Sequence, residues 1–533
     1  MRRGLAVTGR VHPVPDNLFN DSFNSSAFHS MTRRISPFAL RITVASLPLL
    51  LAACGSVAPK AFTSEEVRSR AAQDVVAMYK DQEPVIAPID FHEAAARALK
   101  YNLDYRLKVM ETALSRSLYD ASTYEMLPRL VAGAGYSSRN NDSGGTSIGI
   151  EDRQVSLRPS TSQERDHSMA NLSFSWNALD FGVSYLRAQQ KADQVLMADE
   201  RRRKVIQNVL QDVRNSYWRA LGAQKLLGRV DGLLERVNKA LERSVEVEKQ
   251  GLMPQAQILG YQRALLDAVN TLTLRRQDLE LARAELRALM SLEPGVNFTL
   301  AEQAEVQLPL PPVNMEALER LALEKRPEIM EEWYRKRVTE NDIKAAKILL
   351  WPNVSFDAGW QYDSNKYNYN SNWVDTGVRV SWDLLKLAQY PALGRAQQAQ
   401  NETDDMRRLA LSMAVLTQVR VGVQRYGLSL QELKFAETSL QVDQRLLKYA
   451  QSAAKSHFDS ELEVIRTEAR ALLGEYQRYA AYSNAQAAWG RLYNSVGLDI
   501  LPDTVQAHDV KTLAQAMKST TTQWQQTVFQ VAK

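Results

Sequence analysis

The stretch NVSFDAGWQYD (353–363) alternates between apolar and polar residues along its whole length. Its apolar positions are Val354, Phe356, Ala358, Trp360 and Tyr362. The positions between them carry Asn, Ser, Asp, Gly or Gln. Because successive side chains of a strand point to opposite faces, the stretch predicts a β-strand with one apolar and one polar face.

This strand has a counterpart earlier in the chain. WPNVSFDAGWQY (351–362) aligns with LPRLVAGAGYSS (127–138) at a shift of 224 residues. TGVRVSWDLLK (376–386) likewise matches ANLSFSWNALD (170–180) at a shift of 206. Solenoid repeats are much shorter, at ~20–50 residues. The sequence therefore indicates that a whole module is duplicated and that each copy contributes two alternating strands.

Each module has the same order of predicted elements. A helix (about 90–124 and 314–347) precedes a strand, a polar loop (138–166 and 364–372) and a second strand. Two long helices follow. They are separated by short breaks at 249–259 and 454–465, and the returning helices cover about 255–291 and 460–496. We therefore divide the body of the chain at residue 300, into modules 88–300 and 301–500, followed by a polar tail, 501–533.

The first long helix of each module is predicted over about 185–250 and 403–456. Apolar residues recur every three or four positions, which is typical of a coiled-coil seam. In the first module they are Val205, Val209, Val213, Tyr217, Leu226, Val230, Leu233, Val237 and Leu241; in the second they are Leu411, Val415, Val419, Leu433, Leu440 and Leu447. At ~1.5 Å per residue such helices extend roughly 100 Å.

The four alternating strands fit a barrel wall that faces lipid on one side and a watery lumen on the other. On this interpretation the lipid-facing side chains are Phe174, Trp176, Phe356, Trp360 and Trp382. Four strands cannot close a barrel, so copies of the chain would share it: two copies supply eight strands and three supply twelve. The alternative is a soluble sheet with one face on a core.

The amino terminus reads as a secretory signal. A basic start at Met31–Arg34 leads into an apolar run and then Leu51-Ala-Ala-Cys54. LAAC resembles the lipobox of bacterial lipoproteins, so residues 1–53 are interpreted as an over-extended start plus signal peptide and 54–87 as a lipid-anchored segment. Cys54, the only cysteine, is the predicted lipidation site.

Composition excludes several other functions. Residues 54–533 hold 60 basic and 59 acidic residues, which gives no reason to expect nucleic acid as a partner. No phosphate-binding loop or nucleophile constellation is present, and the six histidines are scattered. His457, Asp459 and Glu461 are better read as solvated loop residues than as metal ligands. We expect no cofactor, no metal and no enzymatic activity.

The lipobox, the duplicated modules and the strands that begin after a proline together resemble the TolC-like outer-membrane efflux and secretion channels, in their lipoprotein branch. The resemblance covers about residues 88–500. It implies a mainly α fold with a small β part. Long antiparallel coiled-coil-like helices would form a periplasmic α-barrel, and four strands per chain would contribute to a shared twelve-stranded transmembrane β-barrel.

The resemblance also implies partners and a location. The protein would be a homotrimer in the outer membrane, lipid-anchored and extending into the periplasm, where it would meet an adaptor protein and an inner-membrane pump. It would be the passive exit channel of a tripartite efflux or secretion system. A non-channel periplasmic scaffold lipoprotein and a periplasmic enzyme or binding protein are the alternatives.

The family places functional residues at the helix breaks. Carboxylates at the second break would ring the periplasmic gate, and Glu463 matches best, with Asp459 and Glu461 nearby. An arginine, Arg466, stands where the next family acid would fall. Adaptor contacts would lie at Gly251, Leu252 and Met253. An ordinary solvated acid and plain turn chemistry are the alternative interpretations for these two groups.

Overall fold

The computed structural model describes residues 60–155, 158–251, 253–302, 308–312, 314–455, 461–501 and 507–531. The chain divides into two compact units, Met1–Asp74 and Val75–Lys533. The described part of the first unit contains most of helix α2 (Ser64–Tyr79), which begins with a reciprocal cap. The backbone N–H of Glu66 donates to Thr63 Oγ1 at 3.2 Å, and the N–H of Thr63 donates to the Glu66 carboxylate at 2.8 Å.

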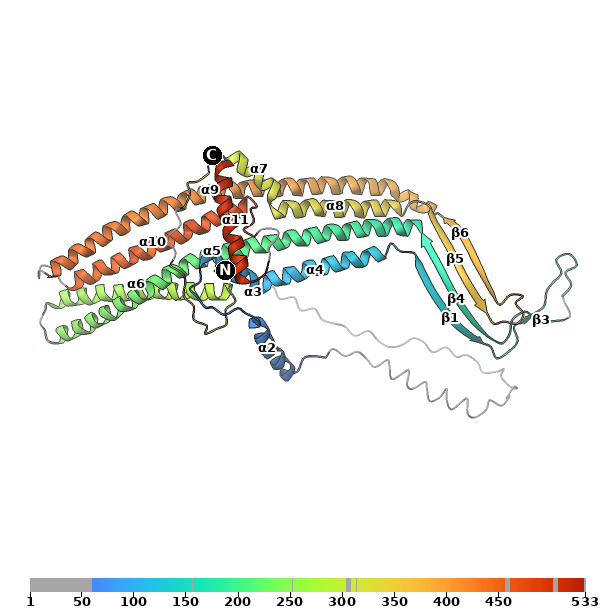
Figure 1. The fold of residues 1–533 in the computed structure, drawn as a ribbon, viewed down its shortest axis with the longest axis horizontal. Helices are drawn as coiled ribbons and strands as arrows, with labels where there is room; N and C mark the ends of the chain where they lie inside the picture. Colours follow the sequence, from blue (N-terminus) through green and yellow to red (C-terminus); the bar gives the residue numbers. More distant parts are fainter. Residues whose placement is uncertain are drawn as a thin grey trace, which may run out of the picture. The chain divides into compact units, whose positions relative to one another are not determined.

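The second unit is a duplicated module, as the sequence predicts (Figure 1). The first copy contains α3 (Phe91–Tyr101), α4 (Leu103–Tyr124), β1 (Arg129–Ser138), β4 (Asp166–Asn177), α5 (Ala178–Lys249) and α6 (Gln255–Leu289). The second contains α7 (Met315–Lys325), α8 (Pro327–Ile348), β5 (Asn353–Asp363), β6 (Asn372–Ser381), α9 (Tyr390–Lys455) and α10 (Glu461–Ser495). A short 3-10 helix, η1 (Leu384–Gln389), precedes α9.

The single helix predicted at the start of each module is two helices. In the first copy the break falls at Asn102, whose side chain accepts the backbone N–H of Tyr105 and so caps α4. In the second copy it falls before Pro327, which occupies the first turn of α8 because a proline lacks the N–H that a helix interior needs. Each module therefore begins with a short helix followed by one of 22 residues.

The strands form one antiparallel sheet in the order β1-β4-β5-β6. The two modules meet where β4 pairs with β5, so β1 and β6 are its edges. The loop predicted at 138–166 contains a small hairpin, β2 (Gly144–Gly145) and β3 (Ser160–Thr161). Within the second unit the sheet lies at one end, and the C-terminal ends of α5 and α9 and the N-terminal ends of α6 and α10 lie at the other (Figure 1).

The long helices are held together by the predicted seams. Residues of the α5 seam from Val209 to Val237 are buried, and they pack against α6 and α10. On α9 the most buried seam residues are Val415 and Val419. α9 contacts α10, α10 contacts α5, and α5 contacts α6, so the four helices form a layer whose edges are α9 and α6.

Residues 510–531, expected to be a polar tail, form helix α11 (Val510–Val531). Val510, Leu513 and Met517 are buried and lie three and four residues apart on one face of the helix. That face packs against α3. The tail is therefore part of the folded body, because its apolar residues recur at helical spacing among the polar ones.

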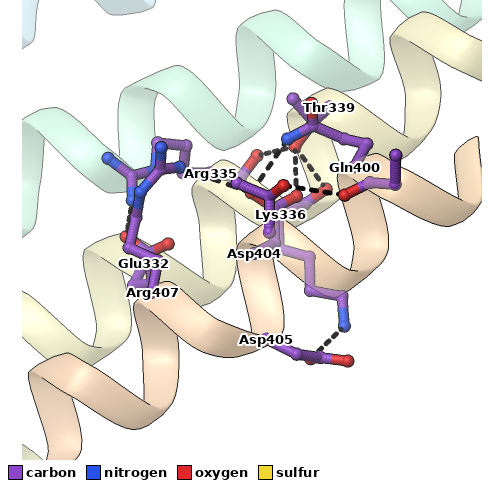
Figure 2. Close-up of polar contacts among 10 residues, drawn as sticks. Glu332, Arg335, Lys336, Thr339, Gln400, Asp404, Asp405 and Arg407 are labelled. Carbon is purple, nitrogen blue, oxygen red and sulfur yellow. Dashed lines mark hydrogen bonds and ion pairs between the residues drawn. The ribbon is translucent and has the colours of Figure 1, made fainter. Parts of the chain in front are cut away.

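A polar cluster joins α8 to α9 (Figure 2). Asp404 is only 3% exposed, and its carboxylate accepts hydrogen bonds from Gln400 Nε2 at 3.0 Å and Thr339 Oγ1 at 3.3 Å. Next to it, Lys336 Nζ lies 3.0 Å from Asp405 Oδ1, and Arg335 pairs with Glu332 (Figure 2). A buried carboxylate needs such partners because its charge is costly to remove from water.

Among the described helices, none is both long enough and apolar enough to span a membrane.

Candidate channel surfaces

The strand register sorts the side chains of the sheet into two faces. Across β4 and β5, Trp176 is opposite Phe356, Phe174 opposite Ala358, and Leu172 opposite Trp360. The β5–β6 register continues this face with Val354 opposite Val380 and Phe356 opposite Val378. Since side chains opposite each other lie on the same face, the four strands place most of their apolar positions together. Val131, Met169 and Trp373 are the exceptions and lie on the other face.

The five predicted lipid-facing residues are all accessible on this side of the protein, to different degrees. Phe174, Phe356, Trp360 and Trp382 are 38%, 41%, 43% and 49% exposed. Trp176 is half-buried because its ring packs against Phe356, with centroids 5.6 Å apart, and Phe181. Trp382 follows the end of β6, and its Nε1 donates to the carbonyl of Leu350 at 3.0 Å. Their contact with lipid stays a prediction.

The opposite face is polar and carries most of the charges of the strands. Its residues include Arg129, Asn171, Ser173, Ser175, Ser355, Asp357, Gln361, Asp375 and Arg379. Where this face meets the helices, a cavity of about 730 Å³ is lined by Arg129, Ser175 and Asp357 from the strands and by Asp180 and Arg187 from α5. The polar face therefore continues as a polar surface onto the first turns of α5.

The two loops at the far end of the strands are fastened to each other. Asn365 is 6% exposed; its Oδ1 accepts the N–H of Glu164 at 3.1 Å and its Nδ2 donates to the carbonyl of Ser162 at 2.9 Å. His167 is also buried, and its Nδ1 lies 2.8 Å from Asp363. These partners are about two hundred residues apart in the chain, so sequence spacing could not indicate them.

The first helical break has the predicted turn chemistry. α5 ends at Lys249, and Gly251 has a φ of +65°, a left-handed conformation that suits glycine. Pro254 then precedes the first residue of α6. Met253 is 37% exposed, and Leu252 lies outside the described residues. Whether Gly251, Leu252 and Met253 contact an adaptor stays a prediction.

The second break carries the gate candidates. Glu461 and Glu463 lie in the first turn of α10, and Asp459 lies outside the described residues. Glu461 Oε1 is 3.4 Å from Nη1 of Arg243 on α5, and Glu463 Oε2 is 3.8 Å from Nη1 of Arg466. Each described carboxylate thus has a cation nearby, including the arginine that departs from the family pattern. Their gating role stays a prediction.

The Arg243–Glu461 pair belongs to a ladder that sequence reasoning did not find. Arg229, Arg236 and Arg243 of α5 pair with Glu475, Glu468 and Glu461 of α10. The partners recur every seven residues on both helices, in opposite chain directions, as antiparallel coiled-coil geometry requires. The heptad spacing of the three arginines could have indicated the ladder.

Cys54, the predicted lipidation site, lies outside the described residues.

Residues 95–291 match the family model of outer membrane efflux proteins. No curated protein matches the chain. Among solved structures, a membrane protein from Pseudomonas aeruginosa is 15% identical with a TM-score of 0.60, covering 77% of this chain and 90% of that one.

Two named channels show the same likeness. The Campylobacter jejuni CmeC outer membrane channel is 11% identical with a TM-score of 0.60, covering 83% of this chain and 94% of that one. The Neisseria gonorrhoeae MtrE outer membrane channel is 13% identical with a TM-score of 0.57, covering 79% and 94%. At these identities the structural likeness establishes the fold alone. The residues that match the family model lie within the first module of this chain. Part of the first module, residues 95–291, is thus similar to outer membrane efflux proteins, and the chain shares its fold with outer membrane channels.

Proposed function

We propose that the protein is the outer-membrane exit channel of a tripartite efflux or secretion system. The observation that carries the proposal is the register of the sheet, which gathers most of the apolar side chains of four strands on one face and most of the polar ones on the other. Val378 and Val380 are each 66% exposed on the apolar face. A soluble scaffold would cover such residues, whereas a wall between lipid and a watery lumen exposes them to lipid.

The channel closes by association of three copies. In one chain β1 and β6 are edges whose outer backbone groups lack a partner strand, and such edges are not stable in lipid. Pairing β6 of one copy with β1 of the next satisfies them, and three copies give twelve strands. The number three rests on the resemblance to TolC-like channels.

The helices offer a matching seam for the same association. Edge helix α6 exposes Leu259, Leu266, Leu274 and Leu281, and edge helix α9 exposes Phe435, Val442 and Tyr449. Both series recur every seven or eight residues, so each forms an apolar stripe along its helix. α9 of one copy packs on α6 of the next, and the helical layer then continues the barrel as a tunnel.

The remaining parts of the proposal concern the membrane anchor and the partners. Cys54 carries lipid at the start of the mature chain, and Gly251, Leu252 and Met253 meet a periplasmic adaptor that joins the channel to an inner-membrane pump. The lipid is tested by palmitate labelling, which Cys54→Ser should abolish. Labelling that survives the substitution would rule out this site.

The channel itself is tested by recording currents after adding the purified protein to a planar lipid bilayer. Discrete conductance steps are expected, with the oligomer measured in parallel by mass photometry. Vesicle-inserted oligomers that never conduct, in wild type and in variants altered at the gate, would overturn the proposal.

A further inference from the structure

A cationic groove lies midway along α5 and α9, beside the C-terminal third of α10. Two neighbouring cavities, of about 360 Å³ and 330 Å³, lie among α5, α9 and α10 and share the lining residues Arg425, Ala488 and Arg491. We treat them as one feature, the mid-helix groove. Together they have the size of sites that hold small organic molecules, which measure ~300–1,000 Å³.

The charges of the mid-helix groove are mainly positive. Its basic residues are Lys204, Arg326, Arg425 and Arg491, and its acidic lining residue is Glu432. Lys204 and Arg326 are already paired with Glu328. Within the described chain, Arg425 and Arg491 have no carboxylate within 4 Å, although Asp212 interacts with Arg491 at longer range. Two guanidinium groups are therefore left to hold an added anion.

The uncharged lining has both polar and apolar parts. Side-chain amides come from Asn208, Gln211, Asn215, Gln418, Asn484 and Asn494. Val421 and Leu428, two exposed apolar residues of α9, lie one turn or so on either side of Arg425. Guanidinium and amide groups suit sulfonate, carboxylate or phosphate oxygens. The aliphatic side chains suit the carbon skeleton that bears them.

Helix α10 fixes the side on which the groove opens. Tyr482, Trp489 and Tyr493 lie on one face of α10; Tyr482 packs in the cluster that contains residues of α3, and the ring of Tyr493 stacks on Trp524 of α11. Arg491 lies two residues from both Trp489 and Tyr493, about 200° around the helix. The mid-helix groove is therefore on the side of the helical layer that faces away from α3 and α11.

Helix α5 links this side to the polar face of the sheet. Arg187 lines the cavity against the polar face, while Asn208 and Asn215 line the mid-helix groove. These three positions are separated by multiples of seven residues, which keep to one face of a coiled-coil helix. In the assembled tunnel this face is the lumen.

We propose that the mid-helix groove binds an organic anion on its way through the tunnel. The inference rests on the proposed function and narrows its substrate class to molecules that combine an acidic group with an apolar skeleton. Three copies would place three grooves, each with Arg425 and Arg491, around the lumen at one level.

The probe is pyrene-1,3,6,8-tetrasulfonate, whose binding to the purified full-length protein is measured by equilibrium dialysis. We expect saturable binding that weakens with salt. The double variant R425Q/R491Q should weaken it at least tenfold, and R425K/R491K, which keeps the charges, should retain most of it. The matched control K511Q/K518Q removes two exposed cations from α11 and should change affinity less than twofold.

Four results would overturn the inference. Unchanged binding in R425Q/R491Q would exclude the groove as the binding site. An equal loss of binding in R425Q/R491Q and K511Q/K518Q would mean that the probe responds only to the net charge of the protein. If inorganic sulfate bound to the groove as tightly as the pyrene probe and displaced it, a site that selects organic anions would be excluded. Bilayer currents of the same samples separate this inference from the proposed function. If the wild-type protein conducts but does not bind the probe, only the groove is refuted. If the wild-type protein binds the probe but never conducts, the channel is refuted.

Discussion

Arg236 of α5 contacts the carboxylate of Glu468 on α10, and this pair is the middle of three that join the first module to the second near the helical tips. Exposed ion pairs contribute little singly, ~0–1 kcal/mol each. The ladder is also the part of the α5–α10 contact that salt can weaken. These three ion pairs therefore join the α5–α6 pair to the α9–α10 pair weakly enough for the two pairs to separate.

Opening the ladder should widen the periplasmic end of the channel. In R236A/R243A we expect the open probability in bilayers to rise several-fold, since ~1 kcal/mol corresponds to roughly fivefold in an equilibrium. The control is R263A, which removes an exposed pair within α6 alone. Equal currents in the ladder variant and the wild type would show that the α5–α10 contact does not limit opening.

The gate prediction concerns Glu463. Three copies around a narrow entrance bring like charges together, which favours capture of a cation, and a carboxylate ring should make the pore prefer cations. Glu463→Ala should therefore weaken block by multivalent cations from the periplasmic side, while assembly is intact. If block is unchanged in Glu463→Ala, Asp459 and Glu461 are the next residues to substitute. Loss of block after substitution of any of these three residues would still place the constriction at the second helical break.

The two faces of the sheet should respond differently to the same substitution. Arginine at Phe356 or Val380 would place a cation against lipid, at a cost of ~2–4 kcal/mol near the bilayer midplane, and should impair insertion. Arginine at Asp357 or Ser381, on the polar face, should be tolerated and shift ion selectivity. Heat-resistant oligomer in outer-membrane fractions measures insertion. If both faces respond alike, the strands are not a barrel wall.

Glu328 makes stability depend on pH. Burial by itself would raise the pKa of its carboxyl, but hydrogen bonds from Arg326 and Lys204 outweigh burial and lower the pKa to about 2. The stabilisation is complete above the ordinary pKa and is lost as pH falls toward 2; it amounts to roughly 3 kcal/mol at most. E328Q should therefore lower the melting temperature at pH 6 and do so much less at pH 3.

The control for Glu328 is E319Q, which breaks the exposed Glu319–Arg420 pair and should shift the melting temperature less. A Glu328 effect of the same size at both pH values would mean that the side chain acts through packing and not through its charge.

The buried carboxylate between α8 and α9 should matter more than its exposed neighbour (Figure 2). D404A leaves Gln400 without its acceptor and Arg407 without its carboxylate partner, at a cost of ~1–3 kcal/mol in unfolding free energy. D405A removes an exposed partner of Lys336 and should cost less than ~1 kcal/mol. Denaturant midpoints of the two variants measure the difference, and equal midpoints would contradict the assigned burial.

Much of the fold was predictable because it depends on sequence patterns that repeat every two to seven residues. The alternation at 353–363 gave the bounds of β5, and the heptads gave the buried seams. The helix starts were less accurate: α5 begins at Ala178, where the Asn177 side chain caps it, and α9 at Tyr390, ahead of Pro391 in its first turn. A cap is a local hydrogen bond that leaves no mark on hydrophobic periodicity.

What could not be predicted depends on residues far apart in the chain. Asn365 meets Glu164 and Ser162 only after the two modules are side by side, and Arg425 meets Arg491 only after α10 has folded back along α9. α11 was missed because Thr and Gln residues surround its three buried positions. For the gate and adaptor candidates the sequence gives positions on the tips, and their roles depend on other chains.

The two open edges of the sheet have a genetic consequence. In the ring of copies that we propose, each chain offers its β1 edge to one neighbour and its β6 edge to the other, so a chain damaged at β6 alone can still join through β1. Such a ring cannot close, so the wild-type chains within it are inactive as well. In cells that express both alleles, a proline in β6 should therefore be dominant over the wild type, whereas a chain damaged at both edges should be recessive.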